Sequence, residues 1–124
     1  LRPTKIYVNE VLKLANKNLI NSAAHITGGG LIENIVRSIP NNFTANIDLS
    51  KLRTKKIFKW LKSQKISDNE MLRTFNCGVG FCLIIEKKNE RKIKKYFSKK
   101  FEPYKIGTIS KGKKRLNLYN SVKW

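Results

Sequence analysis

The most constraining feature of this sequence is a nearly unbroken apolar run from Val79 to Ile85. A run of this length is typical of a strand that is buried on both faces, because a strand with one wet face alternates apolar and polar residues. Such a strand needs neighbouring strands at its sides and a covering layer on each face. The run therefore argues against a helical bundle and favours a layered α/β or α+β domain.

Shorter apolar patterns of helical or strand-like spacing alternate along the rest of the chain. They predict helices over 8–17, 31–39, 57–61 and 93–101, and strands over 23–27, 43–49, 104–109 and 116–122. Ser67 and Glu70 have the spacing of a capping box and predict a further helix that begins at Asp68. Because helices fall between most strands, we predict that residues 1–124 form a single α+β domain with a mixed sheet.

The net charge of +19 is the most unusual feature of the composition. A basic excess suggests nucleic acid or an anionic membrane as a partner. Only 6 of the 27 basic residues are Arg, however, whereas specific phosphate and base readers favour Arg together with interleaved aromatic residues. We therefore interpret most of the charge as a solvated surface and do not expect nucleic acid as the partner. A small basic nucleic-acid-binding module is the alternative.

Cys77 and Cys82 are five positions apart within a strand-like stretch, and odd spacing places them on opposite faces of a strand. This spacing argues against a disulfide between them and favours a reduced, cytoplasmic protein. One His and two Cys give no spacing typical of a zinc site, so we predict no metal ligands. No apolar stretch approaches the roughly 20 residues of a membrane span, and we expect no membrane partner.

Three consecutive glycines, Gly28 to Gly30, follow the predicted strand 23–27 and precede the predicted helix 31–39. Glycines allow backbone N–H groups to approach a ligand, and a helix N-terminus supplies unpaired donors with a partial positive charge. The arrangement is typical of a phosphate site, although a glycine triplet is also consistent with a mere tight turn. His25 and Thr27 would lie on the same face of a regular strand, beside the glycines.

A second group of glycines, Gly78 and Gly80, stands at the start of the apolar run. Alternating glycines at a strand start mark close approach by another backbone or by a ligand, and both interpretations are open here. Cys77 is predicted to be a small buried residue and not a nucleophile, because no second His is present to activate it.

Two long blocks of the sequence carry a family resemblance. His25 to Asn34 reads His-Ile-Thr-Gly-Gly-Gly-Leu-Ile-Glu-Asn, and Met71 to Gly80 reads Met-Leu-Arg-Thr-Phe-Asn-Cys-Gly-Val-Gly. In this order the blocks resemble those of the C-terminal half of aminoimidazole ribonucleotide synthetases, which are phosphoribosylformylglycinamidine cyclo-ligases. The resemblance spans nearly the whole chain and weakens after about Lys111.

The resemblance implies a three-layer α/β/α domain with a mixed sheet and partial likeness to a ferredoxin fold. It also implies an N-terminal domain, absent from this chain, that forms the homodimer and binds most of the ATP, so we expect the isolated chain to be inactive. The implied reaction converts formylglycinamidine ribonucleotide and ATP to aminoimidazole ribonucleotide, ADP and phosphate, and Mg²⁺ is expected with the nucleotide. Another phosphotransfer enzyme of the same superfamily is a weaker alternative.

His25 is the predicted catalytic residue, since histidine is the only residue type whose unperturbed side chain titrates near neutral pH. The alternative is a histidine held within the core. Glu33 and Asp48 are isolated carboxylates, so no metal ligand is assigned. The predicted substrate- and phosphate-binding residues belong to the two blocks and are Thr27, Gly28, Gly29, Gly30, Asn34, Arg73, Thr74, Asn76, Gly78 and Gly80.

Overall fold

The computed structural model describes residues 5–124, and within them the chain forms two compact units. Unit 1 comprises the described part of Leu1–Ala23 together with Leu83–Tyr104. Unit 2 comprises Ala24–Cys82 and Lys105–Trp124, and it contains both glycine blocks. Helices fall between most of the strands, and the larger sheet contains both parallel and antiparallel pairs. The predicted α+β class with a mixed sheet is therefore confirmed.

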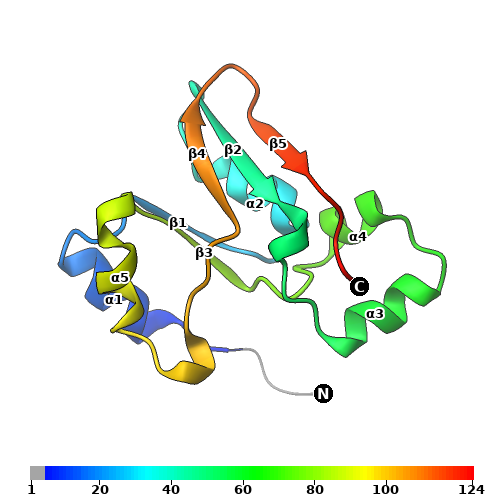
Figure 1. The fold of residues 1–124 in the computed structure, drawn as a ribbon, viewed down its shortest axis with the longest axis horizontal. Coiled ribbons are helices and arrows are strands. Elements are labelled where there is room, and N and C mark those ends of the chain that lie inside the picture. Colours follow the sequence, from blue (N-terminus) through cyan, green and yellow to red (C-terminus); the bar gives the residue numbers. More distant parts are fainter. Residues whose placement is uncertain (1–4) are drawn as a thin grey trace. The chain divides into compact units, whose positions relative to one another are not determined.

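Unit 1 is built around two helices, α1 (Val8–Asn16) and α5 (Glu90–Lys94), which lie side by side in Figure 1. Its core consists of Leu14, Leu19 and Ile93, each at most 4% exposed. Tyr96 and Phe97 pack against this core from a turn, after α5 has ended. The short 3₁₀ segments η2 (Lys87–Asn89) and η3 (Lys99–Phe101) complete the unit.

The predicted helix over 93–101 is therefore wrong in extent, because α5 ends at Lys94. The physical reason is the charge of the segment. Arg91, Lys92, Lys94 and Lys95 bring like charges within three or four positions of one another, and such pairs destabilise a helix. The aromatic residues still reach the core, but without a continuous helix to carry them.

Unit 2 contains a three-stranded sheet with β2 (Phe43–Asp48) in the centre. β2 pairs antiparallel with β4 (Gly107–Lys111) and parallel with β5 (Leu116–Tyr119). Ala45 and Ile47 are buried, and α2 (Gly30–Arg37) lies behind this sheet in Figure 1. The half-buried pattern predicted for 43–49 holds from Ala45 onward, where Leu49 is also buried and Asn46 and Asp48 are only partly covered, whereas Thr44 is buried as well.

The C-terminal end of α2 is joined to the β4–β5 connection by one arginine. The Arg115 guanidinium donates to the carbonyl oxygens of Val36 at 2.6 Å and Ile39 at 2.7 Å. Carbonyls in the last turn of a helix have no partner within the helix, so this side chain satisfies them. This contact orients α2. The other end of α2, its N-terminus, begins at the glycine triplet.

The apolar run 79–85 is not a strand buried on both faces, as its composition predicted. β3 (Phe81–Ile84) pairs with β1 (Ser22–His25) in a two-stranded sheet, and each of its residues is only half-buried. A two-stranded sheet has no central position, so neither strand gains a neighbour on each side. Cys77 lies in the turn before the strand, so the prediction that Cys77 and Cys82 point to opposite faces of one strand does not apply. Both cysteines are free.

Candidate functional site

The glycine block forms a tight loop between β1 and α2. The Gly30 N–H donates to the Thr27 carbonyl at 3.0 Å, and Gly29 and Gly30 have φ angles of 86° and 60°. A side chain at Gly30 would overlap the backbone of Leu72 and Arg73, where α4 (Asp68–Thr74) passes. Gly30 is thus required both by its left-handed conformation and by the close approach of α2 to α4.

Asn34 holds this loop in shape from inside α2. Its side-chain amide donates to the carbonyl oxygens of Gly28 at 3.1 Å and Gly30 at 2.7 Å. The N-cap residue of α2, Gly29, makes no side-chain capping bond. A Cβ built on Gly28 would meet no atom within 4 Å, so this side of the loop is open. The N-terminus of α2 therefore has no side-chain cap and has open space at Gly28, whereas the Glu33 carboxylate lies beside Gly29.

The second block follows α4 and turns back sharply. Asn76, Cys77, Gly78 and Val79 form a turn in which the Val79 N–H donates to the Asn76 carbonyl at 2.8 Å. Cys77 and Gly78 both have positive φ, as the central residues of a type I′ turn do. The Asn76 Oδ1 accepts from the Gly78 N–H at 3.0 Å, which stabilises the turn.

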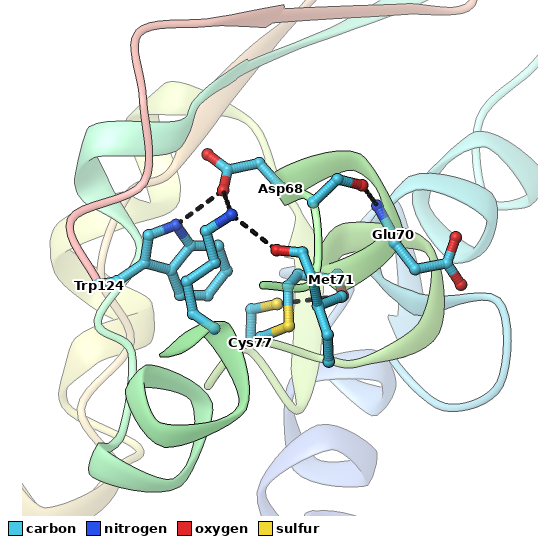
Figure 2. A network of polar contacts seen from close by, with 8 residues as sticks. Asp68, Glu70, Met71, Cys77 and Trp124 are labelled. Carbon is cyan, nitrogen blue, oxygen red and sulfur yellow. Dashed lines mark hydrogen bonds and ion pairs between the residues drawn. The ribbon is translucent and has the colours of Figure 1, made fainter. Parts of the chain in front are cut away.

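A polar network fixes the start of α4 (Figure 2). Asp68 Oδ1 accepts from Lys62 Nζ at 2.7 Å and from Trp124 Nε1 at 3.1 Å. Ser67 caps the helix by accepting from the Glu70 N–H, as predicted, whereas the Glu70 carboxylate accepts from Thr74 and so does not close a capping box. These contacts hold α4 in place, and its last residues reach the glycine loop.

The two blocks meet at a hollow of about 300 Å³. It is lined by residues of the glycine block, the end of α4 and α3 (Lys56–Ser63), namely Ile26, Thr27, Phe58, Thr74, Phe75 and Asn76. The Phe58 and Phe75 rings lie 6.3 Å apart with an interplanar angle of 52°. One wall of the hollow is therefore aromatic, and three of its lining side chains can hydrogen-bond.

His25 lies two residues before Thr27 and is exposed, as is Thr27, whereas Ala24 and Ile26 are buried. β1 ends at His25, so Thr27 lies beyond the strand, but the alternation of exposed and buried residues continues as far as Thr27. The exposure also contradicts the alternative of a histidine held in the core. The His25 ring packs on Phe81 with centroids 5.7 Å apart, and His25 is not among the residues that line the hollow.

Comparison with known proteins places both blocks in one family. A family model described as AIR synthase related protein, C-terminal domain, matches residues 1–117. The chain belongs to this family. Three of its relatives are named phosphoribosylformylglycinamidine cyclo-ligase, from Staphylococcus aureus strains MSSA476, MW2 and JH9. Each is 43% identical over 113 residues, which cover 90% of this chain and 33% of the relative, so the chain spans about a third of their length.

In this AIR synthase related domain, the structure brings together only part of the predicted set of site residues. Thr27, Thr74 and Asn76 line the hollow. Gly78 and Gly80 have backbone roles, because a side chain at Gly78 would overlap the Arg53 carbonyl and the Gly80 carbonyl accepts from the Ile26 N–H at 3.0 Å. For Gly78, close approach by another backbone is thus the interpretation that the structure favours.

Two further predicted residues, Asn34 and Arg73, do not line the hollow. The Asn34 side-chain amide donates to carbonyls of the loop. The backbone of Arg73 lies against Gly30, and the Arg73 side chain is exposed. Sequence reasoning missed Phe58 and Phe75 as lining residues. One feature of the sequence could have indicated Phe58. The apolar residues of its helix, at 57, 58, 60 and 61, cover more than one helical face, so they cannot all face the core.

Several carboxylates of the described chain are bonded to neighbouring side chains. Within residues 5–124, no group of three His, Cys, Asp or Glu side chains could hold a metal ion. Glu33 pairs with Arg37 at 3.1 Å, and Glu70 accepts from Thr74 at 2.9 Å. Asp48 accepts from Ser50 and Asn120, and these hydrogen bonds hold the pKa of its carboxyl below the ordinary value.

Among the described helices, none is long and apolar enough to cross a membrane.

Both thiols should react slowly with alkylating reagents at neutral pH in the folded chain. Burial raises the pKa of Cys77 from 9.0 to about 11 and that of Cys82 to about 12. The thiolate is the reactive form, so its population should become appreciable only well above pH 9. Iodoacetamide labelling followed by mass spectrometry, with and without denaturant, measures this. Rapid labelling of Cys77 in the folded chain at pH 7 would contradict its assignment as a buried structural residue.

Proposed function

We propose that this chain is the C-terminal third of a phosphoribosylformylglycinamidine cyclo-ligase and that its hollow is part of the active site. The observation that supports this proposal is that the two blocks line one hollow, with Thr27 from the first block and Thr74 and Asn76 from the second. The named relatives support the same reaction, which closes formylglycinamidine ribonucleotide to aminoimidazole ribonucleotide at the expense of ATP.

The glycine loop is the part of the site suited to a phosphate group. Gly28 leaves open space, and the N-terminus of α2 directs a partial positive charge toward it. Asn34 fixes the loop carbonyls, so the loop does not need to reorganise when an anion binds. Phosphoryl transfer asks a protein mainly for such positioning and charge stabilisation. The nucleotide supplies the phosphoryl group that makes the amide oxygen of the substrate a good leaving group.

His25 and Thr27 extend this surface along the exposed face of the strand. In the proposed site, His25 donates a hydrogen bond or a proton to the reacting amide group, and the Thr27 hydroxyl donates to phosphate. Thr74 and Asn76 approach from the end of α4 on the other side of the hollow. The four side chains would then hold the ligand between the two blocks.

The described residues contain no group of three His, Cys, Asp or Glu side chains that could hold a metal ion, and no step in this proposal is routed through Mg²⁺. We infer that the metal ligands and most of the ATP contacts belong to an N-terminal domain, for which the rest of the relatives' length leaves room. The same proposal includes a homodimer formed by that domain and a cytoplasmic enzyme.

A domain exchange tests the proposed function. The 113 matched residues of this chain would replace the corresponding third of the Staphylococcus aureus cyclo-ligase, in a bacterial strain that lacks its own enzyme. We expect growth without added purines, because both halves of the site would be present. A chimera with His25→Ala serves as the control and should fail to support growth. The parent cyclo-ligase is assayed in the same experiment and should be active. The proposal would be contradicted if the chimera is soluble and folded and binds substrate but shows no turnover.

A further inference from the structure

The exposed face of α3 is a basic surface that carries a tryptophan. Trp60 is 58% exposed, and Ile57, one helical turn before it, is 49% exposed. We propose that this face of α3 binds single-stranded nucleic acid, with a base stacked on Trp60 and backbone phosphates held by the flanking lysines. Neither Trp60 nor Ile57 lines the hollow, so this binding stands or falls independently of the proposed function.

The segment around α3 carries charge of one sign. Residues 51–65 include no Asp or Glu, and their basic residues are Lys51, Arg53, Lys55, Lys56, Lys59, Lys62 and Lys65. Lys62 is half-buried and pairs with Asp68 at 2.7 Å, whereas the others are exposed. In Figure 1, α3 lies away from the three-stranded sheet of its own unit. A surface of this kind attracts a polyanion and raises its local concentration.

The lysines at the start of α3 oppose the helix that carries them. Lys55 is the N-cap residue, Lys56 is the first residue of the helix, and the first turn contains no acidic residue. Positive charge is unfavourable at a helix N-terminus, and Lys55 and Lys59 add a like-charged pair four positions apart. These side chains therefore do not stabilise the helix, whereas a polyanion bound along its exposed face would offset both unfavourable effects.

Trp60 and Ile57 supply the apolar part of the surface. They are three positions apart in α3, so they lie on the same side of the helix. An exposed indole ring stacks on any base while nearby lysines contact the phosphates, and this combination is typical of proteins that bind single strands without sequence preference. Binding of this kind does not need the Arg forks that read base edges, whose scarcity argued against nucleic acid in the composition.

The exposed apolar area of α3 is too narrow for the other partner that a basic helix with tryptophan can bind, an anionic membrane. A helix that lies in a membrane interface buries a whole apolar face among the lipids. α3 has only eight residues, and its other two apolar side chains, Phe58 and Leu61, are already partly covered by the protein. One exposed ring between lysines fits a stacked base better than a lipid layer.

Fluorescence anisotropy of labelled oligonucleotides titrated with the 124-residue chain tests the stacking. The probes are a single-stranded DNA of about 12 nucleotides and an abasic strand of the same length and charge. We expect the strand with bases to bind roughly 5- to 100-fold more tightly, the gain typical of one stacked base. Trp60→Leu should remove most of this preference, and Trp60→Phe should keep most of it. Tyr119→Leu, at an aromatic residue of β5 that is 44% exposed, is the control and should leave the preference intact.

The salt dependence of binding tests the lysines. Lys56→Gln combined with Lys59→Gln should weaken the binding of both strands. It should also reduce the slope of log affinity against log salt by about 1.4, since each phosphate contact on a single strand contributes about 0.7. The control is Lys111→Gln combined with Lys113→Gln, which removes the same charge at the end of β4 and just after it. This control should leave the slope nearly unchanged.

Three results would overturn the proposal. If both strands bind equally, or if Trp60→Leu keeps the preference, no base stacks on Trp60. If the two lysine pairs weaken binding equally, the charge of the whole chain acts as a diffuse field and α3 is not the binding surface. If tryptophan emission shifts to the blue on phosphatidylglycerol vesicles while the two strands bind equally, the surface belongs to a membrane.

Discussion

His25→Ala should lower kcat of a cyclo-ligase that contains this domain by roughly 10²- to 10⁴-fold, the usual contribution of a general acid or base. The side chain is exposed, shares the strand face of Thr27 and stands two residues from the glycine loop. Removing an exposed imidazole leaves no cavity in the core, so the fold should be retained. The loss should therefore appear in turnover and hardly in the melting temperature.

His25→Gln separates the two possible roles of the imidazole. Glutamine can still donate a hydrogen bond, so it should restore part of the activity if the residue only orients the amide group. If proton transfer is the main role, glutamine should be as inactive as alanine. Steady-state kinetics and thermal melts of both variants check this. Wild-type kcat in both variants, together with melting points several degrees lower, would assign His25 to packing on Phe81 alone.

The local parts of this structure could be predicted from sequence because their determinants lie within a few residues. The strand–glycine–helix unit at 22–37 follows from a short apolar run, three glycines and helical spacing. The start of α4 follows from Ser67, which caps it as predicted. The exposure of both His25 and Thr27 follows from the alternation of a strand, although β1 itself ends at His25.

The parts that failed depend on contacts between distant segments. An apolar run of seven residues does not show how many strands will flank it, and β3 has only β1 as its neighbour. The hollow exists because Gly30 lets α2 approach the end of α4, which is set by residues more than 40 positions apart. Asn34 could be identified as a site residue, but its role in shaping the loop became clear only from the bonds to Gly28 and Gly30.

Gly28 and Gly30 of the loop should differ strongly in how much stability is lost when each is replaced by alanine. Gly30→Ala should destabilise the chain by roughly 2–5 kcal/mol, because alanine is strained at a φ of 60° and its methyl group overlaps the Leu72 and Arg73 backbone. Gly28 has no positive φ and open space around it, so Gly28→Ala should change stability by less than about 0.5 kcal/mol. A substitution at Gly29 could not separate these effects, since its φ is 86° and a Cβ there would meet Glu33.

Urea unfolding of the 124-residue chain measures the stability of both variants. The variant that keeps its stability should nevertheless lose activity. Gly28→Ala keeps the fold but places a methyl group where the anion approaches. We expect the full-length enzyme with Gly28→Ala to lose roughly 100-fold in kcat/KM, the cost of displacing a bound group by about 1 Å. A Gly28→Ala enzyme with normal kinetics would show that the open side of the loop faces only solvent. Unchanged stability of Gly30→Ala would contradict the close approach of α2 to α4, on which the hollow depends.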